Sequence, residues 1–114
     1  TLQILDPAPL EELRSLGDTS FQEQTVQLFL DDSTTRIMAA HEALTKKDGP
    51  VLVREVHSIK GNAKLIGAVR MAGLCQTLED RANNAQYDGA LELLNQIEGE
   101  FEQVKTALQN YMVP

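Results

Sequence analysis

His57 is the residue of this sequence whose type and surroundings best suit covalent chemistry. An imidazole is largely neutral near neutral pH, and the neutral ring is a competent nucleophile. The residues that follow place Lys60, Gly61 and Lys64 within about two helical turns of it. Lysines at that distance attract anionic groups, so this set can receive an anionic group such as a phosphoryl group.

A helix over about 50–66 must carry this histidine. Its apolar residues recur at spacings of three and four, which places them on one face: Leu52, Val56, Ile59, Ala63 and Ile66. At about 100° per residue, His57 points about 140° away from that face. The lysines and the glycine that follow it share its side of the helix, and Val53 lies beside them. The helix should therefore present one largely exposed flank.

Gly61 is the informative residue on this flank. An exposed glycine inside a helix costs about 1 kcal/mol relative to alanine. Gly61 lies one turn beyond His57 and so beside it on the surface. Taken alone, the glycine is equally consistent with helix strain or a nearby helix end. Beside a nucleophile, it predicts that a partner molecule approaches the helix backbone there.

The basic residues of the chain gather around His57. Six of them lie between residues 46 and 70 against two acidic residues, whereas the whole chain of 114 residues has a net charge of −7. Because the chain is acidic, we expect no binding to nucleic acid and no direct membrane contact. A basic segment within it predicts an acidic protein partner, with Val53, Arg54 and Lys64 in the contact surface.

The other reactive side chains predict no second site. His41 lies in the preceding helix, one residue after an apolar position. No glycine or lysine lies within one turn of it, so it is interpreted as an ordinary surface histidine. Two histidines without a carboxylate at ligand spacing argue against a metal site. The single cysteine, Cys75, excludes an internal disulfide and a cysteine-based zinc site. It fits a reducing compartment, and we expect a cytoplasmic protein.

Helical periodicity predicts an all-α chain that forms a single domain over residues 1–114. The expected elements are a short helix over about 10–16 and bundle helices over about 20–47, 50–66, 68–84 and 88–112. Their short connections predict an antiparallel up-down four-helix bundle, with the short N-terminal helix covering one end.

Local signals mark where these helices begin and end. Pro7 and Pro9 are expected to precede the first helix. We expect Ser20 and Glu23 to form a capping box and Asp88 to cap the last helix. The breaks between bundle helices are Gly49-Pro50, Gly67 and Asn83-Asn84.

The segment His57-Ser58-Ile59-Lys60-Gly61-Asn62-Ala63 resembles the signature of histidine-containing phosphotransfer (HPt) domains. That signature is His, any residue, an aliphatic residue, Lys, Gly and two small residues. A glycine follows downstream, and Gly67 matches it. Asn62 departs from the pattern, in which serine is commoner at this position. The similarity covers the chain from about Asp6 to Tyr111.

The resemblance implies a four-helix bundle whose exposed His57 takes a phosphoryl group from a receiver-domain aspartate and passes it to another receiver. Lys60 would help hold the phosphoryl oxygens, and Gly61 would leave room for the receiver. The Mg²⁺ would belong to the receiver, so the chain would need no cofactor of its own. It would be a phosphocarrier without ATP-binding or kinase machinery. We expect a monomer that binds receiver domains or a hybrid sensor kinase.

Three other interpretations stay open. A non-catalytic helical adaptor would bind its partner through the basic segment, with His57 incidental. The phosphotransfer module of a chemotaxis-type kinase shares much of the motif. An enzyme with His57 as general base is disfavoured, because no carboxylate or serine completes a catalytic set on the same flank. The start at Thr1 and the opening Leu5-Asp6-Pro7 favour a fragment of a larger kinase.

Overall fold

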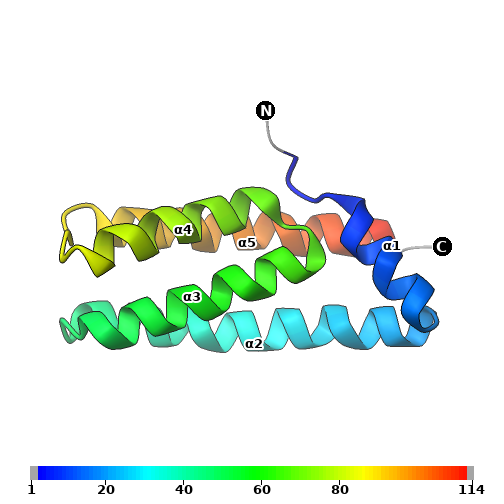
Figure 1. Cartoon of the computed structure of the whole chain (residues 1–114), viewed down its shortest axis with the longest axis horizontal. Helices are drawn as coiled ribbons and strands as arrows, with labels where there is room; N and C mark the ends of the chain where they lie inside the picture. Colours follow the sequence, from blue (N-terminus) through cyan, green and yellow to red (C-terminus); the bar gives the residue numbers. More distant parts are fainter. Residues whose placement is uncertain (1–2, 113–114) are drawn as a thin grey trace.

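The computed structural model describes residues 3–112, and this part of the chain contains five α-helices joined by short turns (Figure 1). They are α1 (Pro7–Leu16), α2 (Thr19–Thr45), α3 (Gly49–Ile66), α4 (Val69–Asn83) and α5 (Ala90–Met112). No strand occurs among these residues, so the predicted all-α class is confirmed. Within the same range, no helix has the length and apolar character needed to cross a membrane.

Helices α2 to α5 form an antiparallel four-helix bundle. Helix α2 packs against α3 and α5, and α4 packs against the same two helices. Figure 1 shows consecutive helices running in alternating directions, with the α2–α3 and α4–α5 connections together at one end. Helix α1 lies at the other end, against α2 and α3. The predicted up-down bundle with a covering N-terminal helix is confirmed.

Helix α1 covers the part of the core that the shorter helices leave open. Helices α3 and α4 have 18 and 15 residues, whereas α2 and α5 have 27 and 23. Leu10 and Leu13 of α1 are buried in the common core. The buried side chain of Gln22 in α2 donates from Nε2 to the carbonyl oxygen of Leu10 at 2.9 Å. This bond ties α1 to the bundle and satisfies a buried amide.

Aspartates begin the first three helices. The three N-caps are Asp6, Asp18 and Asp48, whose carboxylates accept hydrogen bonds from the backbone N–H groups of Ala8, Phe21 and Val51. The predicted capping box of Ser20 with Glu23 is therefore wrong. The side chain of Asp18 caps this helix start by accepting from the N–H of Phe21, and Ser20 lies inside the helix.

Two further helix starts differ from expectation. Helix α1 begins at Pro7 and not near Leu10, because proline is tolerated in a first turn, where its missing N–H would have no partner. Helix α5 begins at Ala90, and Asp88 lies in the turn before it. The first backbone bond of α5 runs from the N–H of Leu93 to the carbonyl of Gly89, so Asp88 does not occupy the expected cap position.

The core face of α3 fixes the rotation of the helix that carries His57. The five residues predicted for this face are at most 1% exposed: Leu52, Val56, Ile59, Ala63 and Ile66. Elsewhere in the core, the rings of Phe29 and Phe101 meet edge to face at 5.6 Å and join α2 to α5. With its apolar face anchored inward, α3 must turn His57 outward.

Gly67 makes the tight turn from α3 to α4. Its φ of 84° lies in the left-handed region, which glycine adopts without steric penalty. A side chain at this position would collide with the carbonyl oxygen of Asp6. The N–H of Asp6 donates to the carbonyl of Gly67 at 2.8 Å. The glycine downstream of His57 therefore serves packing at the end of α3.

Candidate functional site

His57 projects from the middle of α3 toward solvent. Its side chain is 65% exposed, although its neighbour Val56 is completely buried. The predicted orientation of this histidine away from the core is confirmed.

Gly61 leaves the surface beside His57 bare. It is exposed, and a Cβ added to it would meet no other atom within 4 Å. Packing within the chain therefore does not require glycine here, although glycine weakens a helix. The open surface allows another molecule to come close to the backbone of α3 beside the imidazole.

A carboxylate on the neighbouring helix α4 contacts the imidazole. The Nδ1 atom of His57 lies 2.9 Å from Oε2 of Glu79. The side chain of Glu79 is only 12% exposed, so the contact is largely shielded from water. The sequence reasoning missed Glu79 as a site residue, because it examined only the helix that carries His57.

Lys60 lies between α3 and α4 and not on the open flank. Its side chain is 12% exposed, and its Nζ lies 2.7 Å from Oε1 of Glu79. The same ammonium donates to Oε1 of Gln76 at 3.0 Å. The prediction of an exposed Lys60 is wrong, because its position about 80° from the core direction lets the long aliphatic stem reach across to α4.

The shared carboxylate of Glu79 is held in its ionised form. Burial opposes ionisation, but the hydrogen bonds from Lys60 and His57 outweigh burial and lower the pKa of Glu79 below its usual value. An ionised carboxylate accepts hydrogen bonds and donates none. A neutral His57 ring must therefore carry its proton on Nδ1, which leaves the lone pair on Nε2, across the ring from Glu79.

Asn62 fastens α3 to α2 on the other side of the site. Its Nδ2 donates to Oδ2 of Asp32 at 2.7 Å, and Nε of Arg36 donates to the same oxygen at 2.8 Å. These bonds, chiefly the one from Asn62, lower the pKa of Asp32. Asn62, the residue that departs from the usual signature, thus connects α3 to α2 at the position directly after Gly61 in the sequence.

A shallow hollow of about 280 Å³ adjoins this connection, between α2 and α3. It is lined by Thr25, Leu28, Phe29, Asp32, Asn62 and Leu65. Leu28 and Leu65 are 69% and 53% exposed, respectively. Large apolar side chains that flank a hollow are typical of a contact surface for another protein.

The basic segment around His57 is less open than its composition suggested. Four of its six basic residues form ion pairs: Lys46 with Glu42, Arg54 with Glu55, Lys60 with Glu79 and Arg70 with Glu100. Arg54 is still largely exposed, and Val53 is half-buried against the core. Lys64 is exposed, and it has no ion pair with any residue of the described range. The predicted basic segment therefore holds few unpaired cations within the described range, and Lys64 is one of them, two helical turns from His57.

The second histidine and the cysteine have structural surroundings. His41 lies with Nε2 2.8 Å from Oε1 of Glu98 on α5, a carboxylate partner that the sequence did not predict. Within residues 3–112, no cluster of three potential metal ligands occurs. Burial raises the pKa of the Cys75 thiol to about 12, so this cysteine is packed in the core and is not an activated nucleophile.

Comparison with known proteins gives a family match over most of the bundle. The model of the family described as "Hpt domain" matches residues 24–107. Histidine-containing phosphotransfer proteins 2 and 5 of Arabidopsis thaliana are each 28% identical to this chain over 104 residues. The matches cover 89% of this chain and 67% and 66% of those two proteins. The chain therefore spans about two thirds of the length of these curated relatives.

A solved structure has the same arrangement of helices. The crystal structure of histidine-containing phosphotransfer protein B (HptB) from Pseudomonas aeruginosa PAO1 is similar with a TM-score of 0.91. Its sequence is 29% identical, and the match covers 98% of this chain and 96% of that chain.

Proposed function

The chain belongs to the Hpt domain family, and we propose that it is a phosphorelay intermediate in which His57 carries the phosphoryl group. The group comes from an aspartate of one receiver domain and passes to an aspartate of another. The observation that carries this proposal is the 2.9 Å contact of His57 Nδ1 with Glu79, on a ring that is otherwise exposed. It leaves Nε2 as the nucleophilic nitrogen.

The transfer step follows from this arrangement. The lone pair of Nε2 attacks phosphorus, the N–P bond forms, and the bond between phosphorus and the aspartyl oxygen breaks to release the receiver carboxylate. The proton on Nδ1 stays in place, so the phosphorylated ring becomes positively charged. The carboxylate of Glu79 compensates that charge directly. Transfer to the next receiver reverses the step and regenerates the neutral ring.

The proposed partner is a receiver domain that brings its own Mg²⁺, and the proposed carrier is a cytoplasmic monomer without kinase machinery. The receiver docks over Gly61, where no side chain blocks the backbone. Its contact surface includes Val53, Arg54 and Lys64, as proposed from the sequence. On the α2 side, we extend this surface to Leu65 and Leu28, since the hollow that they line begins one residue after Gly61.

The test is incubation with a receiver domain phosphorylated on its aspartate. The wild-type chain should acquire phosphate that is labile to acid and stable to base, as expected for phosphohistidine. The variant His57→Gln should acquire none and should keep its thermal midpoint, because the site is exposed. The matched variant His41→Gln should accept phosphate at the wild-type rate. Phosphate uptake by His57→Gln would refute the assignment, and a wild-type chain that binds the receiver without uptake would be an adaptor.

A further inference from the structure

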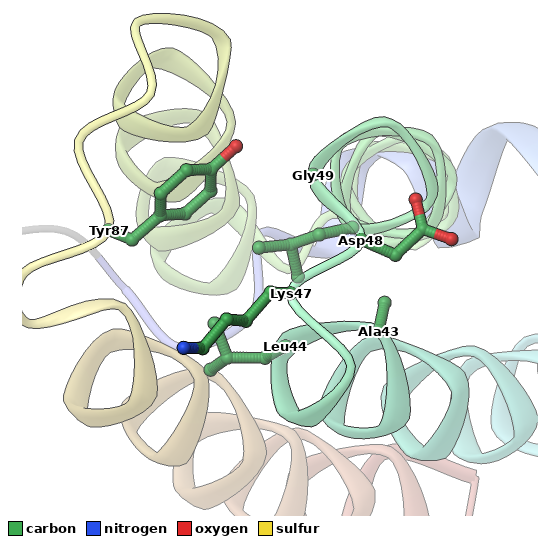
Figure 2. A pocket seen from close by; sticks show the side chains of 7 residues that line it. Ala43, Leu44, Lys47, Asp48, Gly49 and Tyr87 are labelled. Atoms are coloured by element: carbon green, nitrogen blue, oxygen red, sulfur yellow. The ribbon is translucent and has the colours of Figure 1, made fainter.

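A cavity of about 430 Å³ lies where the α2–α3 and α4–α5 connections meet, at the end of the bundle opposite α1 (Figures 1 and 2). Its apolar walls are Ala43, Leu44, Leu52 and the ring of Tyr87. This volume falls within the range of small-molecule sites, about 300–1,000 Å³. None of the residues that line the cavity belongs to the His57 site.

Gly49 at the start of α3 makes room for one wall of this cavity. Gly49 is buried, and a Cβ at this position would collide with the hydroxyl group of Tyr87. Figure 2 shows the hydroxyl end of Tyr87 directed toward the helix that Gly49 begins. No hydrogen bond joins this hydroxyl group to another side chain within residues 3–112. The hydroxyl group therefore lies against Gly49, and Tyr87 forms a wall of the cavity.

Lys47 supplies a positive charge at the rim. Its φ of 58° places it in the left-handed region, where a lysine is uncommon and glycine would be favoured. Its ammonium has no ion pair in the described part of the chain, whereas the adjacent Lys46 is paired with Glu42 at 2.7 Å. Figure 2 shows the Lys47 side chain extending past Leu44 on the side of the cavity where Tyr87 lies.

The remaining charged group at the cavity is directed elsewhere. The carboxylate of Asp48 caps α3 by accepting a hydrogen bond from the N–H of Val51 at 3.2 Å. In Figure 2 this carboxylate points away from Tyr87. The polar group offered to a ligand is therefore one cation, at the edge of an apolar chamber.

We propose that this cavity binds a small amphipathic carboxylate, with its aryl or alkyl body between Leu44, Leu52 and Tyr87. The anionic head would meet the ammonium of Lys47 at the rim, while the hydroxyl of Tyr87, directed toward Gly49, takes no part in binding it. An apolar chamber with a few polar groups at one edge is the usual design of a small-ligand site. The complementary charge selects an anion over a neutral molecule of the same shape.

The probes are phenylbutyrate and its neutral analogue phenylbutanamide, titrated into the chain and followed by backbone amide NMR shifts. Phenylbutyrate should give saturable shifts centred on residues 43–52 and 85–89. The amide should bind about two- to fivefold more weakly, the effect of one partly exposed ion pair. The experiment needs no receiver, so its outcome is independent of the role of His57.

One matched pair of variants and one further variant make the test specific. Lys47→Gln should reduce the affinity for phenylbutyrate to that for the amide, whereas Lys46→Gln should leave it unchanged. Tyr87→Ala should weaken the binding of both probes, because it removes one apolar wall of the cavity. The proposal is overturned by the absence of saturable shifts, by equal binding of both probes, or by equal effects of Lys46→Gln and Lys47→Gln.

Discussion

Oε2 of Glu79 on α4 lies 2.9 Å from Nδ1 of His57 on α3, and the other oxygen of the same carboxylate lies 2.7 Å from Nζ of Lys60. One largely buried side chain therefore sets the tautomer of the imidazole and the position of the neighbouring lysine. Under the proposed function, Glu79 is a positioning residue that also compensates the charge of the phosphorylated ring.

Glu79→Ala is expected to slow phosphorylation of His57 by about ten- to hundredfold, the range found when partners of metal-binding histidines are removed. Glu79→Gln should keep part of the rate, since an amide oxygen accepts from Nδ1–H but carries no charge. Phosphoramidate is the suitable donor because it requires no receiver docking. Ring nitrogen NMR shifts report the tautomer independently. Equal rates and equal shifts in all three proteins would exclude a positioning role.

Gly61→Ala is expected to stabilise the domain by up to about 1 kcal/mol, because alanine favours helix over glycine and the added methyl group meets nothing. Gly61→Gln should also fold, yet it should slow transfer from a receiver by about a hundredfold, the cost of displacing reacting atoms by about 1 Å. Gly99→Gln is the control, since a Cβ at Gly99 on α5 also meets open space. The thermal midpoint and the transfer rate separate the two effects. A wild-type rate for Gly61→Gln would show that no partner docks over this glycine.

Leu65→Ala is expected to raise the receiver concentration needed for half-maximal transfer by about fivefold, equivalent to about 1 kcal/mol of lost contact. Leu28→Ala should act in the same direction. The maximal rate should stay constant, because neither residue contacts His57. Leu91→Ala provides the control, since Leu91 is 55% exposed on α5 and lies outside the hollow. Equal effects of Leu65→Ala and Leu91→Ala would remove the hollow from the docking surface.

The stability of the domain should fall in acid through Glu79. Its pKa is lowered in the folded state from an ordinary value of 4.5. The unfolded chain therefore binds more protons between the two pKa values, and stability rises with pH in that window. The contribution of Glu79 is complete at neutral pH and disappears as pH falls from 4.5 through the folded-state pKa. The free energy of unfolding, measured with urea at several pH values, should rise less steeply with pH for Glu79→Gln than for Glu23→Gln. The same pH dependence of the unfolding free energy in both variants would show that Glu79 does not contribute to acid sensitivity.

The helix that carries His57 could be predicted because its signals are local. Its apolar residues keep helical spacing, Pro50 and Gly67 mark its ends, and one helical wheel fixes the outward direction of the histidine. The start of α2 was harder, because Asp18 and Ser20 offer competing caps two residues apart. Both residue types cap helices well, so sequence preference alone did not separate them.

The partners of His57 could not be predicted in the same way, because they depend on how α4 is rotated against α3. Glu79 is 22 residues from His57 in the chain. A usable signal did exist. Lys60 and Glu79 each lie beside the apolar face of their own helix, on helices joined by a tight turn at Gly67. Opposite charges at the edges of two adjacent apolar faces favour an ion pair across the helix interface.

The pairing of Lys60 with Glu79 has a consequence for the energy of the phosphorylated state. A phosphoryl group brings about two negative charges near neutral pH. The ammonium of Lys60 is already neutralised by a carboxylate 2.7 Å away, and the open cation on this flank, Lys64, is solvated. The domain by itself therefore stabilises the bound phosphate only weakly. Under the proposed function, a phosphoryl group on His57 keeps a high chemical potential, so the receivers, and not the carrier, determine where it finally resides.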